Sequence, residues 1–191
     1  NSSGPVGQAV AVRIDGDLVI FENCKFLGFQ DTLYPRESTS RQYYKNCYIE
    51  GTTDFIFGSA TTLFENCTIH SIKNSYITAA STPEGTAFGF VFKNCKVTAN
   101  PEAKDVYLGR PWRIYAKTAF INCELGKMIK AEGWNNWGKE SNEKTAFYAE
   151  YNSKGAGANP KARVSWSHQL DETSVKAYTL SNIFNGWNPK E

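Results

Sequence analysis

Two aspartates, Asp31 and Asp54, occupy the same place in a repeated pattern, since each lies seven residues after a cysteine. If the repeat builds equivalent turns of a regular structure, their carboxyl groups lie roughly 5 Å apart, the spacing of neighbouring strands. Two carboxylates this close cannot both ionise freely, because mutual repulsion raises the proton affinity of one of them. One would then serve as an acid and the other as a base or nucleophile.

Two glutamines and an arginine extend this set. Gln30 lies six residues after the first cysteine, and Gln8 holds the same position if Ser2 ends the preceding repeat. Their amides can donate hydrogen bonds to a developing oxyanion, and Arg110 is the candidate cation that would keep one carboxylate ionised. An acid, a nucleophile and oxyanion donors together suit acyl transfer. From the spacing alone, the alternative that the aspartates are only turn residues stays open.

The pattern behind these positions is a four-residue motif: an aromatic residue, a variable residue, asparagine and cysteine. It ends at every cysteine of the chain: Cys24, Cys47, Cys67, Cys95 and Cys123. The spacings of 23, 20, 28 and 28 residues are typical of one supersecondary unit repeated along a solenoid. Each motif is strand-like, with asparagine at a turn. We therefore predict an all-β fold, a parallel β-helix.

Stacking of the motifs predicts ladders of side chains. Cysteines and aromatic rings would line the interior, and asparagine side chains would form a hydrogen-bonded ladder along one turn. We favour free cysteines over disulfides, because equivalent side chains on neighbouring coils point in parallel. The motif stops after Cys123. The rest is expected to be rich in loops, with strands at 146–151 and 163–166 and a short helix at 171–178 that caps the open end.

Composition excludes several classes of function. The chain has 21 Lys and Arg against 19 Asp and Glu, so it presents no broad basic field for nucleic acid. No apolar run approaches the roughly 20 residues of a membrane helix. Neither histidine has a second ligand at metal spacing, which excludes a zinc site of the His-x-x-x-His kind. Because the glutamine donors can stabilise an oxyanion, we expect no metal or organic cofactor. The sequence also contains no Gly-x-Ser-x-Gly elbow and no phosphate-binding loop.

At these residues the sequence resembles the pectin methylesterases, the pectinesterase family. The matching motifs are QAVAVR at 8–13, GFQDTLY at 28–34, YIEGTTDFIFG at 48–58 and YLGRPW at 107–112. The resemblance implies one right-handed parallel β-helix domain over 1–191, with the first part of the catalytic domain missing. It also implies a carboxylic ester hydrolase that converts the galacturonate methyl esters of pectin to pectate and methanol.

Carried over position by position, the resemblance assigns roles to the residues. Asp54 would be the nucleophile that forms an acyl-enzyme, and Asp31 the general acid and later the base. Gln8 and Gln30 would stabilise the oxyanion, and Arg110 would hold Asp54 ionised. The residues implied to contact the sugar chain are aromatic: Trp112, Phe57, Tyr34 and Trp134.

The implied partner is pectin, that is, methylated homogalacturonan. We expect a secreted monomer that acts in cell-wall modification and pectin degradation, with secretion inferred from the substrate alone; neither nucleic acid nor a membrane is an expected partner. Two alternatives stay open. Paired carboxylates also fit a β-helix glycosidase or lyase acting on the same polymer, although the glutamine donors and the lack of an acidic calcium cluster argue against these. A carbohydrate-binding β-helix without catalysis is the other.

Overall fold

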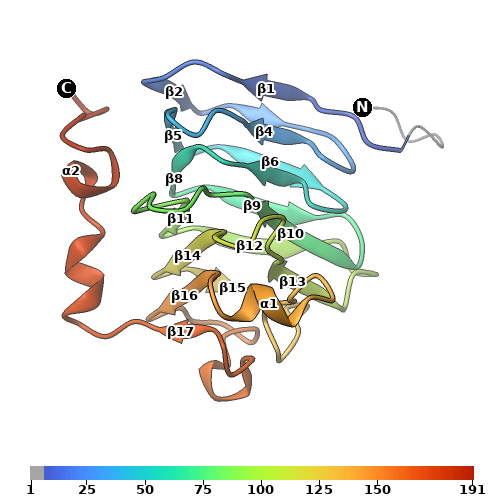
Figure 1. The fold of residues 1–191 in the computed structure, drawn as a ribbon. Coiled ribbons are helices and arrows are strands. Elements are labelled where there is room, and N and C mark those ends of the chain that lie inside the picture. Colours follow the sequence, from blue (N-terminus) through green and yellow to red (C-terminus); the bar gives the residue numbers. More distant parts are fainter. Residues whose placement is uncertain (1–6) are drawn as a thin grey trace.

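The protein is described over residues 7–191 in a computed structural model. Within that range, seventeen strands form three parallel sheets. Over residues 12–125 the chain visits the three sheets in turn, so that one strand from each makes a coil, and the coils stack on one another (Figure 1). This architecture is the predicted β-helix.

Within each sheet, the strands follow one another along the stack in the order of the sequence. The first sheet contains β1 (Val12–Ile14), β4 (Leu33–Pro35), β7 (Ile56–Gly58), β10 (Ser75–Ala80) and β13 (Val106–Gly109). The second contains β2 (Val19–Glu22), β5 (Arg41–Lys45), β8 (Thr61–Glu65), β11 (Phe90–Lys93), β14 (Lys117–Ile121), β16 (Phe147–Tyr151) and β17 (His168–Gln169). The third contains β3 (Lys25–Phe26), β6 (Tyr48–Gly51), β9 (Thr68–Ser71), β12 (Lys96–Ala99) and β15 (Glu124–Leu125).

Helices are short and few in the described range. They are α1 (Glu140–Glu143), α2 (Leu180–Ile183) and the 3₁₀ helices η1 (Pro160–Ala162) and η2 (Ser174–Ala177). None of these helices in residues 7–191 has the length and hydropathy of a membrane span.

The cysteine motif forms the corner between the second and third sheets. Its asparagines adopt the left-handed backbone conformation, with φ between 53° and 57° at Asn23, Asn46, Asn66, Asn94 and Asn122. Asparagine visits this conformation more readily than most residues. The side chains are exposed, and among the described residues the one hydrogen bond between two asparagine side chains joins Asn152 to Asn122 at 3.1 Å. The asparagines form the turn through their backbone conformation and not through hydrogen bonds between their side chains. The predicted hydrogen-bonded ladder was therefore wrong.

The interior ladders agree with the prediction. The aromatic residues of the motif pair in register along the second sheet, and successive rings stack with centroids 4.3–5.2 Å apart: Phe21, Tyr44, Phe64, Phe92 and Phe120. All five cysteines are free thiols, and four of them are buried. Because each stacked ring removes a large apolar area from water, this column forms the centre of the hydrophobic core.

The repeat continues beyond Cys123, contrary to expectation. β16 pairs with β14 and leads into Asn152 and Ser153, where serine stands in place of cysteine. Ser153 Oγ accepts a hydrogen bond from the Cys123 N–H at 3.3 Å, just as Cys67 Sγ accepts one from the Cys47 N–H at 3.4 Å. An oxygen replaces the sulfur in this position, which is why a search for cysteines misses the last repeat.

The expected strand at 163–166 is a turn. The Arg163 side chain is only 2% exposed, and its Nε lies 2.7 Å from Glu150 Oε1. The same guanidinium donates to three backbone carbonyls. This buried pair holds the chain in a turn, and the last strand starts only at His168. The expected strand at 146–151 is present as β16.

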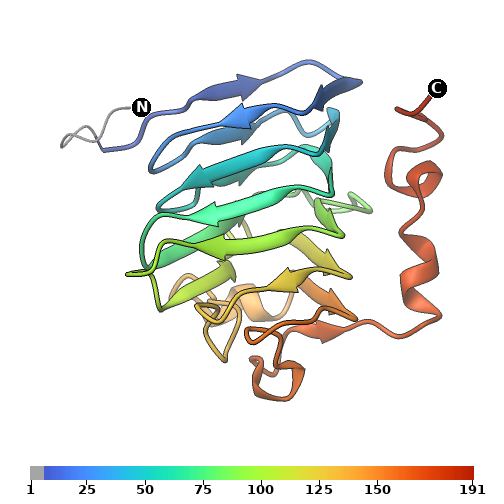
Figure 2. The same cartoon turned by 180° about the vertical axis from the view of Figure 1, so that it is seen from behind.

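The final segment, residues 171–191, lies along the side of the stack and not over its end (Figures 1 and 2). We call it the C-terminal strap. It contains η2, within the helix expected at 171–178, and then α2. Ile183 and Phe184 are buried against the outer face of the second sheet, beside Tyr43 and Leu63. The predicted capping role was wrong, because the apolar outer face of that sheet binds the strap instead.

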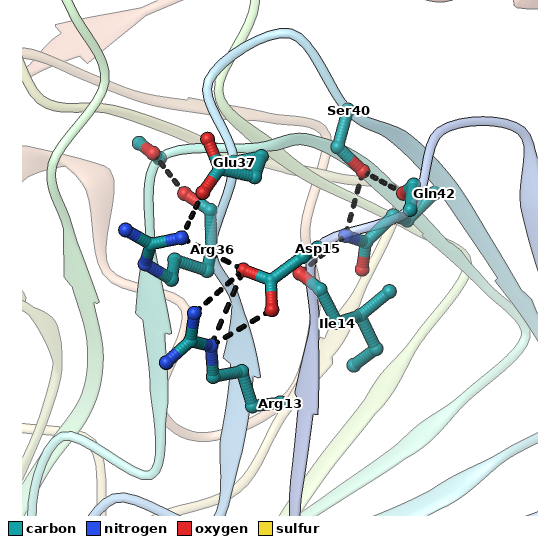
Figure 3. Close-up of polar contacts among 9 residues, drawn as sticks. Arg13, Ile14, Asp15, Arg36, Glu37, Ser40 and Gln42 are labelled. Carbon is teal, nitrogen blue, oxygen red and sulfur yellow. Dashed lines mark hydrogen bonds and ion pairs between the residues drawn. The ribbon is translucent and has the colours of Figure 1, made fainter.

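Polar side chains join the first coil to the second (Figure 3). Asp15 forms ion pairs with Arg36 and Arg13, each at 2.9 Å, and these two arginines lower the pKa of Asp15. Nearby, the buried Gln42 amide donates to the carbonyl of Ile14 at 3.4 Å. Exposed ion pairs stabilise a fold only slightly, so these side chains add little to the backbone pairing of β1 with β4 and of β2 with β5.

Candidate active site

The repeat places Asp31 and Asp54 on adjacent coils. Each lies two residues before a strand residue of the first sheet, and those two residues, Leu33 and Ile56, pair in register. Both aspartates adopt the left-handed conformation, with φ of 65° and 50°, which asparagine and aspartate adopt more readily than other non-glycine residues. The backbone therefore turns into the first sheet at both carboxyl groups.

Gln8 and Gln30 hold equivalent positions one residue before this column. The Ala9 N–H donates to the Gln30 carbonyl at 3.3 Å, just as the Asp31 N–H donates to the Thr53 carbonyl at 3.1 Å. Gln8, Gln30 and Thr53 thus follow one another on three successive coils. Both glutamines line the same cleft as the two aspartates. Ser2, from which the position of Gln8 was counted, lies outside the described residues.

The cleft has a volume of about 360 Å³ and one aromatic wall. The Tyr34 and Phe57 rings stack with centroids 4.2 Å apart, and Trp112 meets Phe57 edge-on at 6.0 Å. Trp137 also lines the cleft. Aromatic faces beside a few convergent polar groups are typical of a small-molecule or sugar-binding site.

Arg110 binds Asp54 through two of its nitrogens. Nε donates to Oδ1 at 3.0 Å and Nη2 donates to Oδ2 at 2.7 Å. The Cζ atom also lies 3.9 Å from the ring centre of Tyr76 and 3.7 Å from that of Trp137. Two rings this near cannot share one face of the guanidinium, so they cover opposite faces. Arg110 is held in one orientation, and it fixes the carboxylate of Asp54.

The two carboxyl groups differ in their electrostatic surroundings. Burial, and then the charge of Asp54, raises the pKa of Asp31 to about 6, while the charge of Arg110 opposes this rise. Burial also raises the pKa of Asp54, but there the opposing contribution includes the hydrogen bonds from Arg110. Asp31 is therefore suited to carry a proton in mildly acidic solution, and Asp54 to stay ionised.

Among the described residues, no three His, Cys, Asp or Glu side chains gather as a metal site.

Trp134 does not reach the cleft. It is 1% exposed, and its ring packs against Phe120 and Tyr148 with centroids 5.9 and 4.6 Å away. The expected contact of Trp134 with sugar was wrong, because a backbone bridge to Gly109 ties this residue to the stack. Trp137 lies in the cleft instead. Its φ of 63° is rare for a bulky residue and is often a sign of a functional position, but the sequence gives no hint of it.

A matched pair of substitutions separates the two tryptophans. We expect Trp134→Ala to lower the free energy of unfolding by about 3–5 kcal/mol, because it empties a fully packed core position. Trp137→Ala removes a partly exposed ring and should cost about 1 kcal/mol. Urea denaturation followed by circular dichroism measures both values. Equal losses in the two variants would contradict the placement of Trp134 in the core.

Comparisons with known proteins agree with this geometry. The sequence profile described as Pectinesterase matches residues 1–187. Pectinesterase 31 of Arabidopsis thaliana is 43% identical over 165 residues, covering 86% of this chain and 51% of the relative. A probable pectinesterase/pectinesterase inhibitor of Brassica napus is 41% identical over 197 residues, covering 95% of this chain and 33% of the relative.

A solved structure gives the same result for the fold. The pectin methylesterase from carrot superposes with a TM-score of 0.87 at 31% identity, over 94% of this chain and 60% of that structure. The chain thus spans between a third and about half of the two curated relatives. Since the family profile covers almost every residue, the chain belongs to the pectinesterase family.

Proposed function

We propose that this chain hydrolyses the galacturonate methyl esters of pectin, giving pectate and methanol. The observation that carries the proposal is the pair of carboxyl groups in one cleft. Asp31, with a pKa of about 6, lies on the coil next to Asp54, which Arg110 holds through two hydrogen bonds. A proton donor beside a fixed carboxylate is what acyl transfer from an ester requires.

In the first step, a carboxylate oxygen of Asp54 attacks the C6 carbonyl carbon of the ester. The carbonyl oxygen becomes an oxyanion, and the amides of Gln8 and Gln30 donate hydrogen bonds to it. Each such donor is worth about 10²–10³ in rate in enzymes where one has been removed. The bond to the methoxy oxygen then breaks, Asp31 transfers its proton to that oxygen, and methanol leaves.

The second step returns the enzyme to its starting state. Asp31, now ionised, takes a proton from water while the water oxygen attacks the acyl carbon. The bond between that carbon and Asp54 breaks, which releases the galacturonate carboxyl group and restores the Asp54 carboxylate. Arg110 stabilises that carboxylate as the leaving group through the same two hydrogen bonds.

The aromatic wall of the cleft would hold the polymer. Trp112 offers a ring to stack on a sugar, with Tyr34, Phe57 and Trp137 beside it. Because pectin is a polymer of the cell wall, we propose that the protein acts outside the cell as a secreted monomer.

Product analysis tests the proposed function. Incubation of the chain with highly methylated pectin should release methanol, without new reducing ends and without unsaturated uronate. New reducing ends would instead identify a glycosidase, and unsaturated uronate a lyase. Binding of pectin with none of the three products would identify a carbohydrate-binding protein and overturn the proposal.

The pH dependence follows from Asp31. The first step needs the protonated form of this residue, so kcat/KM for methanol release should fall as pH rises through about 6. At lower pH it should fall again when Asp54 becomes protonated, which gives a bell-shaped profile. Initial rates between pH 3 and 9 at low substrate concentration measure this profile. A rate that is constant from pH 5 to 8 would exclude Asp31 as the acid of the first step.

A further inference from the structure

A second cleft lies on the third sheet and is larger than the catalytic one. Its volume is about 540 Å³, against about 360 Å³ for the catalytic cleft on the first sheet. Strand β12, Glu124 of β15 and residues from the loops that follow these two strands line it. Because it opens on a different sheet, a ligand bound there leaves the catalytic cleft free.

The charge of this cleft is positive. Three lysines line it, Lys96, Lys104 and Lys127, against one acid, Glu124, which pairs with Lys96 at 3.7 Å. Three positive charges and one negative charge leave a surplus of two. On the adjoining loop, the exposed acids Glu102 and Asp105 do not line the cleft, and Asp105 pairs with Lys130 at 3.6 Å. Such a surplus attracts an anionic ligand.

The cleft also has fixed hydrogen-bonding groups. His70 Nε2 lies 3.0 Å from Asn100 Oδ1, and His70 Nδ1 lies 2.8 Å from Thr98 Oγ1. Since Oδ1 can only accept, Nε2 donates to it, and in the neutral imidazole Nδ1 then accepts from the Thr98 hydroxyl. His70 thereby binds the oxygen of the Asn100 amide, and the NH₂ group of Asn100 can donate a hydrogen bond to a ligand. Ala99 and the exposed Pro101 supply the accessible apolar surface of the lining, while the side chains of Val97 and Met128 are buried in the core beneath it.

We propose that this cleft binds a de-esterified stretch of homogalacturonan, an acidic oligosaccharide. The proposal rests on the proposed function, because each turnover would convert a neutral ester into a carboxylate. The lysines then attract the product of the reaction and not its fully methylated substrate. Hydroxyl groups of the sugar match the amide of Asn100, and its C–H faces match the apolar lining. The enzyme would bind a de-esterified stretch of the polymer in this cleft while the catalytic cleft hydrolyses the esters of another stretch.

Titration with a fully de-esterified oligogalacturonate, followed by NMR of backbone amides, tests this site. We expect shifts at Thr98, Asn100 and Met128, and binding that weakens as salt is added. The double variant Lys104→Glu/Lys127→Glu should bind at least tenfold more weakly at this site. Its initial rate of methanol release from highly methylated pectin should equal that of the unchanged protein. The matched control, Lys144→Glu/Lys176→Glu, reverses two exposed lysines outside the cleft and should bind normally.

Two results would overturn the inference. One is a set of shifts confined to the catalytic cleft, around Trp112 and Trp137. The other is equal affinity of the third sheet for polyglutamate of similar length, which would show attraction of charge without recognition of sugar. Methanol release is measured separately, so the two proposals fail independently: a chain that binds here but releases no methanol overturns only the proposed function.

Discussion

Asp54→Asn should reduce methanol release by about 10⁴-fold or more while leaving the fold intact. An amide is a poor nucleophile, so no acyl-enzyme can form, and removal of a nucleophile typically costs this much. Two features favour folding of the variant. Asparagine tolerates the φ of 50° at this position better than aspartate does, and its Oδ1 can still accept one hydrogen bond from Arg110. Initial rates on highly methylated pectin measure the loss.

The control is Asp105→Asn, which removes an exposed carboxylate paired with Lys130 at 3.6 Å. It should release methanol at the normal rate. Circular dichroism spectra of both variants should match that of the unchanged protein. A well-folded Asp54→Asn variant with more than about a hundredth of normal activity would exclude this residue as the nucleophile.

Asp31→Asn should affect activity and stability in opposite directions. The amide cannot protonate the departing methoxy oxygen or deprotonate water, and loss of a general acid and base lowers rates by about 10²–10⁴. The fold should gain stability, because burial and the neighbouring Asp54 raise the pKa of Asp31 from 3.8 to about 6. An ionised Asp31 is therefore unfavourable in the folded state.

The gain in stability depends on pH in a defined way. Between about pH 4 and pH 6, Asp31 loses its proton in the unfolded chain but keeps it in the folded one, so the unchanged protein loses stability as pH rises. The variant lacks this loss. Its advantage should be near zero below pH 4 and reach about 1–2 kcal/mol above pH 6, a value reduced for partial exposure of the group. Urea denaturation at pH 3.5 and 7 measures it; a constant difference would contradict the raised pKa.

The periodic part of the molecule could be predicted from the sequence. Identical motifs stack in register, so counting from the end of each motif is enough to place Asp31 beside Asp54 and, with Ser2 in place of a cysteine, Gln8 beside Gln30. The same counting fails where a coil has extra residues. Arg110 lies in such a coil, and nothing in the spacing shows that it reaches back to Asp54.

Features without a period could not be predicted in this way. Trp134 and Trp137 lie in one loop with similar neighbours, and only tertiary packing buries the first and leaves the second in the cleft. Arg163 gives no sign in the sequence of its buried pairing with Glu150. The position of the C-terminal strap depends on apolar residues of the second sheet's outer face, which are distant from it in sequence.

The C-terminal strap has a consequence for how the chain folds. In a simple solenoid each coil touches only its neighbours, so folding can spread from coil to coil as the polypeptide is synthesised. Here Arg41 donates a hydrogen bond to the Phe184 carbonyl at 3.0 Å, and Lys190 pairs with Glu65 at 2.8 Å. These contacts join the C-terminal strap to the coils that hold Arg41 and Glu65, and Arg41 and Phe184 are 143 residues apart in the sequence. Contacts between residues so far apart in the sequence form slowly, so we expect docking of the strap to be a late step in folding, and the coils that it joins to unfold together as one unit.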